Sequence, residues 1–280
     1  MTGHGTVGGG SAPPAPAVPA PAAVPGLPVA PLLDEDHLDV WLIRRPKLDV
    51  APAGLDLSEL DDAERRRAAS FIRPSDGITY ASAHIALRRL LGGYLGVAPQ
   101  DVTFVREPCP GCGDPHGRPA VAHPSPPLHF SLAHSQGMAA VGVAATPLGI
   151  DVERLPRDQT VEVCTPALHP AERAELEAVD PVARRALFGQ LWTRKEAYLK
   201  GIGTGLSRDP AEDYLGAEPR DRPPGWVILD LPAGPRHQAA VALRRERPVA
   251  PALRWLPIEA LFAGGTVDVS RGAPAGPLAA

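Results

Sequence analysis

The chain has 280 residues, 44% of them hydrophobic, which is enough for one large or two small domains with a buried core. Its 28 Lys and Arg against 32 Asp and Glu give a net charge of −4, which provides no overall attraction to nucleic acid or to an anionic membrane. Any anion that the protein binds must be held by local groups. No apolar run approaches the ~20 residues of a bilayer span, and three cysteines do not make a disulfide framework, so we expect a cytoplasmic protein.

Both ends of the chain have a composition typical of disorder. Residues 1–31 are almost entirely Pro, Ala, Gly and Val, and residues 264–280 are rich in Gly, Ala and Pro. Such segments bury too little apolar surface to offset the entropy of ordering. We therefore predict two disordered tails, with the folded part between them.

The first part of the folded region predicts a strand followed by two helices. Residues 37–44 alternate apolar and other side chains, as a strand does. A helix should begin at Ser58, which forms a weak capping box with Asp61 three residues later, and continue to about Phe71. A longer helix should follow over residues 77–95.

The rest of the chain predicts a loop and then short strands around two more helices. Residues 106–127, rich in Pro, Gly, Cys and His, form the loop. Strands are expected at 128–132, 139–145, 148–154, 226–231 and 238–244, and helices at 170–179 and 181–200. This interspersed order favours an α+β fold over a doubly wound parallel sheet.

The strand Gly149-Ile150-Asp151-Val152-Glu153 carries two carboxylates. Alternation places Asp151 and Glu153 on one face, roughly 7 Å apart, and the apolar residues on the other. A solvated acidic strand face is one interpretation. A Mg²⁺ site is the other, because one or two carboxylates with water and phosphate oxygens commonly hold that ion.

The helix segment Trp192-Thr193-Arg194-Lys195-Glu196-Ala197-Tyr198-Leu199-Lys200 carries the next charged groups. Helical spacing places Glu196 and Lys200 on one face, in continuation of an apolar stripe. An exposed ion pair is the simple alternative. Of the 28 cations, however, only Lys47, Lys195 and Lys200 are Lys, which suggests that the compact ammonium matters. We interpret Glu196 as a third carboxylate and the two helical lysines as phosphate ligands.

Three further groups could bind an anion, although each is more often structural. His134 stands in a small-residue turn after Leu128-His129-Phe130-Ser131-Leu132. Arg118 stands on a rigid Gly-Arg-Pro turn. Arg67 extends the inner side of its predicted helix.

In their order, the segments Gly117-Arg118-Pro119, Phe130 to Ser135, Gly149 to Glu153 and Trp192 to Lys200 resemble the motifs of the phosphopantetheinyl transferases, of the broad-specificity Sfp type. The resemblance covers roughly residues 36–262. It implies a pseudo-twofold duplication of two similar α+β halves, 36–147 and 148–262, with the active site between them. It also implies an enzyme, acting as a monomer, that moves 4′-phosphopantetheine from coenzyme A to a serine of an acyl or peptidyl carrier protein of polyketide, nonribosomal peptide or fatty acid synthases. Adenosine 3′,5′-bisphosphate is released.

By the same resemblance, Mg²⁺ is bound by Asp151, Glu153 and Glu196, and Glu196 is also the general base. Lys195 and Lys200 lie near the pyrophosphate, and Lys200 stabilises the leaving group. His134, Arg118 and, with less support, Arg67 hold the nucleotide end of coenzyme A. The family usually has Ser before this His, so Ala133 implies one lost hydroxyl contact.

Cys109, Cys112 and His116 lie outside this resemblance and have partial zinc spacing. A fourth ligand is absent unless Cys164 folds back, and a Pro-Gly loop with two free thiols is the simpler interpretation. Two other functions remain open: a catalytically idle carrier-protein binding module on the same fold, and a zinc-ribbon nucleic-acid adaptor, which the acidic net charge disfavours.

Overall fold

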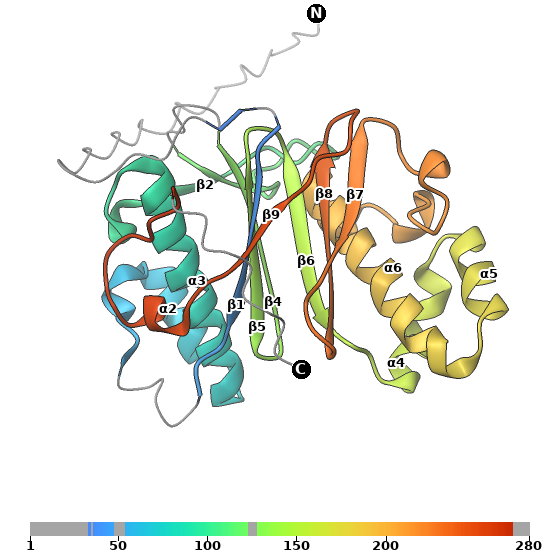
Figure 1. Cartoon of the computed structure of the whole chain (residues 1–280), viewed down its shortest axis with the longest axis horizontal. Coiled ribbons are helices and arrows are strands. Elements are labelled where there is room, and N and C mark those ends of the chain that lie inside the picture. The colour runs from blue at the N-terminus through green and yellow to red at the C-terminus, as the bar shows by residue number, and fades with distance from the viewer. Residues whose placement is uncertain (1–32, 35, 48–53, 123–127, 271–280) are drawn as a thin grey trace, which may run out of the picture.

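The computed structural model describes residues 33–34, 36–47, 54–122 and 128–270. The predicted tail over 1–31 lies outside these residues. Two sheets stand face to face in the middle of the molecule, with helices on their outer sides (Figure 1). The fold is thus a mixture of helices and largely antiparallel sheet, as the α+β prediction required.

The first sheet has the order β4-β5-β1-β9. Its strands are β1 (Leu38–Arg44), β4 (His129–Ser135), β5 (Met138–Ala144) and β9 (Ala252–Trp255). β9 runs parallel to β1, and the other pairings are antiparallel. Helices α2 (Asp62–Ala69) and α3 (Pro74–Leu95) lie on the same side of this sheet (Figure 1), and the side chains of α3 share an apolar core with β1, β4 and β5.

The second sheet has the order β6-β8-β7 and is antiparallel. Its strands are β6 (Leu148–Arg154), β7 (Trp226–Leu231) and β8 (His237–Arg244). Helix α6 (Pro181–Ile202) packs on its outer face, and α4 (Asp158–Cys164) and α5 (Pro170–Ala178) lie against α6. A shared apolar cluster, which includes Val40, Ile150 and Val241, joins the two sheets.

The two sheets are built from segments with the same order of elements. In the first segment, β1 pairs with β5, and β5 also pairs with β4. In the second segment, β6 pairs with β8, and β8 also pairs with β7. In each, a short helix with a capping box precedes a helix of 22 residues that begins at a proline and ends at a left-handed glycine. These glycines are Gly96 and Gly203, with φ of 67° and 86°, a conformation that favours glycine.

The capping-box glutamates also anchor the two long helices. Glu64 of α2 accepts from Arg88 at 2.7 Å, and Glu172 of α5 lies 2.8 Å from Lys195 Nζ. Arg88 and Lys195 occupy the same position in their helices, counted from the proline that begins each helix. The same device therefore ties the short helix to the long helix in both segments.

Several boundaries differ from the sequence prediction. Helix α2 begins at Asp62, because Asp61 and Glu64 form the capping box and Ser58 belongs to a separate 3-10 turn. The structure adds α4, β9 and a short hairpin of β2 (Phe104–Arg106) and β3 (Pro119–Val121). These elements are too short or too rich in proline to give a periodic pattern.

Residues 264–270 belong to the predicted tail over 264–280, but they lie against α3. The Val267 N–H donates to Arg89 O at 3.1 Å, and Val269 is buried in the core beside α3. The prediction fails for this stretch because Gly93 lets the chain approach, since a Cβ there would lie 2.2 Å from Val267 O. No helix in the described part of the chain combines the length and apolar character needed to cross a membrane.

Candidate active site

The close contact of β6 with α6 places the predicted carboxylates. A Cβ at Gly149 would lie 2.0 Å from Ala197 O and 2.3 Å from Gly201 N, so only glycine allows this approach. Ile150 and Val152 face the core between the sheets. Asp151 and Glu153 therefore face α6, as strand alternation predicted.

Asp151 and Glu153 are each held by one polar side chain. Lys200 Nζ donates to Asp151 Oδ1 at 2.6 Å, and Ser135 Oγ donates to Glu153 Oε2 at 2.6 Å. Burial raises the pKa of Asp151 above its usual range despite the Lys200 ammonium. Burial, and then the Asp151 charge, raise the pKa of Glu153 to about 7.

Glu196 faces the same two carboxylates from α6. Burial raises its pKa; the Lys200 ammonium lowers it and the Asp151 charge raises it further. Since Glu196 also raises the pKa of Glu153, the three acids repel one another electrostatically. A carboxylate with a raised pKa is a better proton acceptor near neutral pH than an exposed one.

These acids fit a divalent cation. Asp151 is only 2% exposed, and its Oδ2 is buried without a hydrogen-bond partner. Buried polar atoms normally have such a partner. A hard cation would satisfy that oxygen and relieve the repulsion among the acids. Asp151, Glu153 and Glu196 would hold it, together with water or phosphate oxygens.

A cavity of about 650 Å³ opens next to Lys200. Both segments of the chain contribute to its wall, which includes Glu64, His84, Phe104, Arg118, His134, Leu148, Lys200 and Thr204. Its size is typical of small-molecule sites. Lys200 lines this cavity and also pairs with Asp151, so it connects the cavity to the carboxylates.

Arg118 is fixed at the wall of the cavity by partners from both segments. Its Nε and Nη2 donate to Glu107 Oε2 at 3.0 and 2.6 Å, and Nη1 donates to Gly201 O at 2.9 Å. This clamp joins the loop before β3 to the end of α6. The remaining N–H donors of the guanidinium are available to a ligand in the cavity.

His134 stands near the end of β4 among aromatic rings from α3. Its ring lies edge-to-face with the rings of Tyr80 and His84, with ring centroids 5.7 and 6.5 Å apart. Burial, followed by the charges of His84, Lys200 and Arg67, lowers its pKa to about 4. His134 is therefore neutral near pH 7 and offers a neutral N–H, rather than a cation, to an anion.

Arg67 is exposed, with its guanidinium 4.9 Å from the centre of the Phe71 ring. It influences His134 electrostatically but is not part of the cavity wall. His84, which sequence reasoning missed, does line the cavity, and its Nδ1 lies 2.9 Å from Glu64 Oε1. Glu107 was also missed, and Ser135, although part of a predicted motif, was not predicted to bind Glu153, because only the fold brings these residues to Arg118 and Glu153.

Lys195 does not join this site, contrary to the sequence prediction. Its side chain is almost fully buried beside Glu172 and also donates to Asp213 O. Burial lowers the pKa of Lys195, and the Glu172 charge opposes that effect. The prediction fails because neighbouring helical positions point in different directions, so Lys195 faces α5 while Glu196 faces β6.

Ala133 also differs from expectation. It is 5% exposed and packs in the apolar cluster between the sheets. Ala133 is not among the residues that line the cavity. A Ser at this position would be largely buried, and its effect on coenzyme A binding stays a prediction.

Comparisons with known proteins agree with the resemblance inferred from the motifs. Residues 147–245, which include β6 and α6, match the model of the 4′-phosphopantetheinyl transferase superfamily. The transferase HetI of Nostoc sp. strain PCC 7120 is 30% identical over 221 residues, which cover 76% of this chain and 89% of HetI. Sfp of Bacillus subtilis strain 168 is 23% identical over 63% of this chain and 73% of its own length. AcpT of Escherichia coli O157:H7 is 36% identical over 31% of this chain and 45% of its own length.

The site and these matches define a transferase enzyme. The chain belongs to the 4′-phosphopantetheinyl transferase superfamily. The resemblance inferred from four short motifs is thereby confirmed, and the region matched by the family model holds all three acids.

Proposed function

We propose that the protein transfers 4′-phosphopantetheine from coenzyme A to a serine of acyl or peptidyl carrier proteins, with Mg²⁺ as cofactor. Adenosine 3′,5′-bisphosphate is the second product. The observation that carries this proposal is the approach of β6 to α6 at Gly149, which brings Asp151, Glu153 and Glu196 together beside Lys200.

Each group of the site has a role in this reaction. Bound Mg²⁺ would neutralise pyrophosphate charge and orient the group that is transferred. Glu196, with its raised pKa, accepts the proton of the carrier serine as the hydroxyl attacks phosphorus. Lys200 stands where it can stabilise the negative charge that develops on the bisphosphate leaving group.

The cavity fits the other end of coenzyme A. Arg118 offers a fixed cation for a phosphate, and His134 offers a neutral N–H donor. Arg67, which reaches toward His134 electrostatically, is a candidate for an outer phosphate contact. The 3′-phosphate would then lie near His134, and the pyrophosphate near Lys200.

A pseudo-twofold duplication of halves 36–147 and 148–262 completes the proposal. The repeated strand pairings and the equivalent Arg88–Glu64 and Lys195–Glu172 pairs support it. One element crosses this division, since β9 lies within 148–262 but pairs with β1. A monomer in the cytoplasm stays our prediction for the assembly and its location.

Incubation with coenzyme A, Mg²⁺ and an apo carrier protein, followed by mass spectrometry of the carrier, tests this function. We expect the carrier to gain the mass of phosphopantetheine on its serine, and adenosine 3′,5′-bisphosphate to accumulate in equal amount. Carriers from polyketide, nonribosomal peptide and fatty acid synthases should be compared. Tight carrier binding without any gain in mass would instead indicate an idle binding module.

A further inference from the structure

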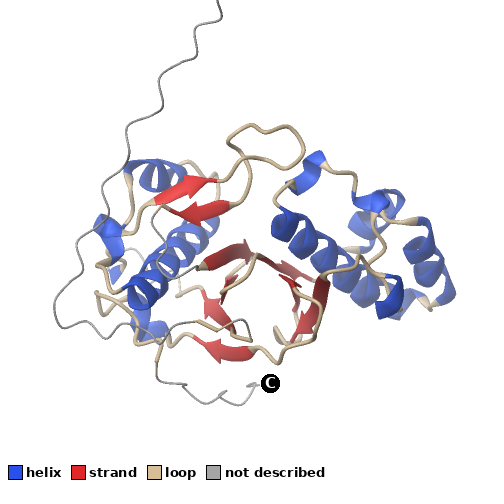
Figure 2. Cartoon of the chain, turned by 90° about the horizontal axis from the view of Figure 1, so that it is seen from above, coloured by secondary structure: helices blue, strands red, loops and turns tan. Residues whose placement is uncertain are grey.

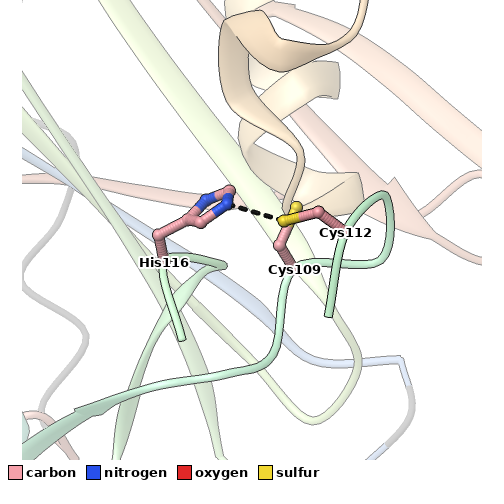
Figure 3. A group of neighbouring side chains, drawn as sticks. All are labelled: Cys109, Cys112 and His116. Carbon is pink, nitrogen blue, oxygen red and sulfur yellow. Dashed lines mark hydrogen bonds between the residues drawn. The ribbon is translucent and has the colours of Figure 1, made fainter. Parts of the chain in front are cut away.

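The loop between β2 and β3 brings two thiols and an imidazole together. Figure 3 shows the side chains of Cys109, Cys112 and His116 directed toward one another. Their ligand atoms all lie within 4.8 Å of one another, and no other three His, Cys, Asp or Glu side chains of the described residues are grouped so closely. Cys112 Sγ and His116 Nε2 are 2.9 Å apart.

The backbone of this loop is folded into a tight knuckle. The Cys109 N–H donates to Asp114 O at 2.7 Å, and the Gly113 N–H donates to Cys109 O at 2.8 Å. Gly113 has a φ of 82°, which a side chain would oppose. The two cysteines of the Cys-x-x-Cys pair are therefore held on the same side of the turn.

The Cys109 sulfur lies inside its own turn, near the backbone N–H groups of Gly111 and Cys112. Cys109 is 2% exposed, whereas Cys112 and His116 are exposed.

Asp114 in the same turn is a candidate for the fourth ligand, although its carboxylate lies outside the group of atoms within 4.8 Å of one another. Asp114 Oδ2 lies 3.5 Å from Cys112 Sγ. In a tetrahedral zinc site with Zn–S of about 2.3 Å and Zn–O of about 2.0 Å, the sulfur and oxygen would also be about 3.5 Å apart. Cys164, the other candidate, packs beside α4 and α6 in a separate apolar cluster.

We propose that this loop binds one structural Zn²⁺ through Cys109, Cys112 and His116, with the fourth position filled by a water molecule or by Asp114 after a movement of its side chain. The ion replaces the proton shared by Cys112 and His116, and binding releases the thiol protons to solvent. Small rotations of the exposed Cys112 and His116 side chains bring their atoms to zinc distances. The simpler interpretation, a loop with two free thiols, does not account for this grouping.

The position of the loop gives the zinc a role. The loop arches from the β2–β3 hairpin toward the end of α6 (Figure 2), where Arg118 donates to Gly201 O. Pro110 and Arg118 both approach Gly203. If the cavity binds coenzyme A, as proposed above, zinc would stiffen the wall that carries Arg118 and tighten binding of the nucleotide end.

Metal analysis of the full chain, purified without chelator, tests the site itself. We expect about one zinc per chain in the wild type and in Cys164→Ser, whose thiol lies elsewhere. Cys112→Ser and His116→Asn should retain less than about a tenth of that zinc. Both replaced side chains are exposed, so these variants should fold even if Cys109→Ser does not.

Cobalt gives a second readout that does not depend on activity. Co²⁺ added to the metal-free wild type should produce thiolate-to-metal absorption and visible bands of tetrahedral intensity, and both should be lost in Cys112→Ser. Wild-type protein without zinc or cobalt bands would overturn the proposal, as would a mass lower by the two hydrogens of a Cys109–Cys112 disulfide. These outcomes do not involve phosphopantetheine transfer, so they are distinct from failure of the proposed function.

Discussion

The two long helices, α3 and α6, carry charged residues at corresponding positions but use them differently. Arg89 and Glu196 occupy the same position, counted from the proline that begins each helix. Arg89 is fully buried and donates to both carboxylate oxygens of Glu59, so its charge is balanced. Glu196 faces other acids and has a raised pKa.

A second pair of corresponding positions, nearer the end of each helix, also differs in what it contacts. Gly93 and Lys200 also occupy the same position, counted from the first residue of their helix. At Gly93 the missing side chain admits Val267 and Val269, whereas Lys200 extends to Asp151 and the cavity. The comparison shows that two helices of equal length place charge differently, balanced by an ion pair at Arg89 of α3 and set among other acids at Glu196 of α6.

The largest effect is expected at Glu196. Glu196→Gln removes the proton acceptor and one proposed metal ligand while keeping the shape of the side chain. Turnover should fall at least ~100-fold, with the free energy of unfolding unchanged or higher because repulsion among the acids is relieved. Steady-state transfer and urea denaturation measure the two quantities. An active Glu196→Gln enzyme would remove Glu196 from the mechanism.

The corresponding residue of α3 should give the opposite pattern. Arg89→Met leaves the Glu59 carboxylate buried without its partner, so we expect the free energy of unfolding to fall by about 3–5 kcal/mol. Turnover per folded molecule should change little under conditions where the variant is folded. A stable Arg89→Met protein with a large loss of turnover would contradict the division of roles between the helices.

Metal binding should oppose the instability of the acid cluster. The folded-state pKa of Glu153 is about 7 against an ordinary 4.5, so this group costs stability as the pH rises through that window. Mg²⁺ should therefore raise the melting temperature more at about pH 8 than at about pH 5.5. Comparing with and without Mg²⁺ at one pH cancels the opposite effect of His134, whose lowered pKa costs stability as the pH falls.

Glu153→Gln is the control for this titration. This substitution removes both the group that takes up the proton and a proposed metal ligand. The increase in melting temperature on adding Mg²⁺ should therefore be smaller and should vary less with pH. Equal shifts at both pH values in the wild type would mean that Glu153 does not compete with protons for the metal.

A smaller effect is expected in the cavity. If His134 contacts the 3′-phosphate, His134→Ala should weaken coenzyme A by about 10-fold but leave 3′-dephospho-coenzyme A nearly unchanged, because only coenzyme A has that group. Isothermal titration calorimetry with both ligands measures the difference. Equal losses for the two ligands would assign His134 a structural role against Tyr80.

Sequence periodicity predicted where the side chains of β6 and α6 point, because that pattern is local. The alternation of residues 149–153 and the helical spacing of Glu196 and Lys200 depend only on neighbouring residues, and both held in the structure. Lys195 was misassigned because its partner, Glu172, belongs to another helix. The packing of residues 264–270 on α3 depends on the long-range approach at Gly93, which composition does not reveal.

The most direct test of the division between site and scaffold compares the two lysines of α6. Lys195→Met should lower the free energy of unfolding by about 3–5 kcal/mol, since buried Glu172 loses its partner, while turnover per folded molecule stays within about twofold. Lys200→Met should lower turnover at least ~10-fold, with a smaller loss of stability because Asp151, whose pKa burial already raises, can take up a proton when the ammonium is removed. The opposite result, a stable but inactive Lys195→Met and a fully active Lys200→Met, would contradict the account.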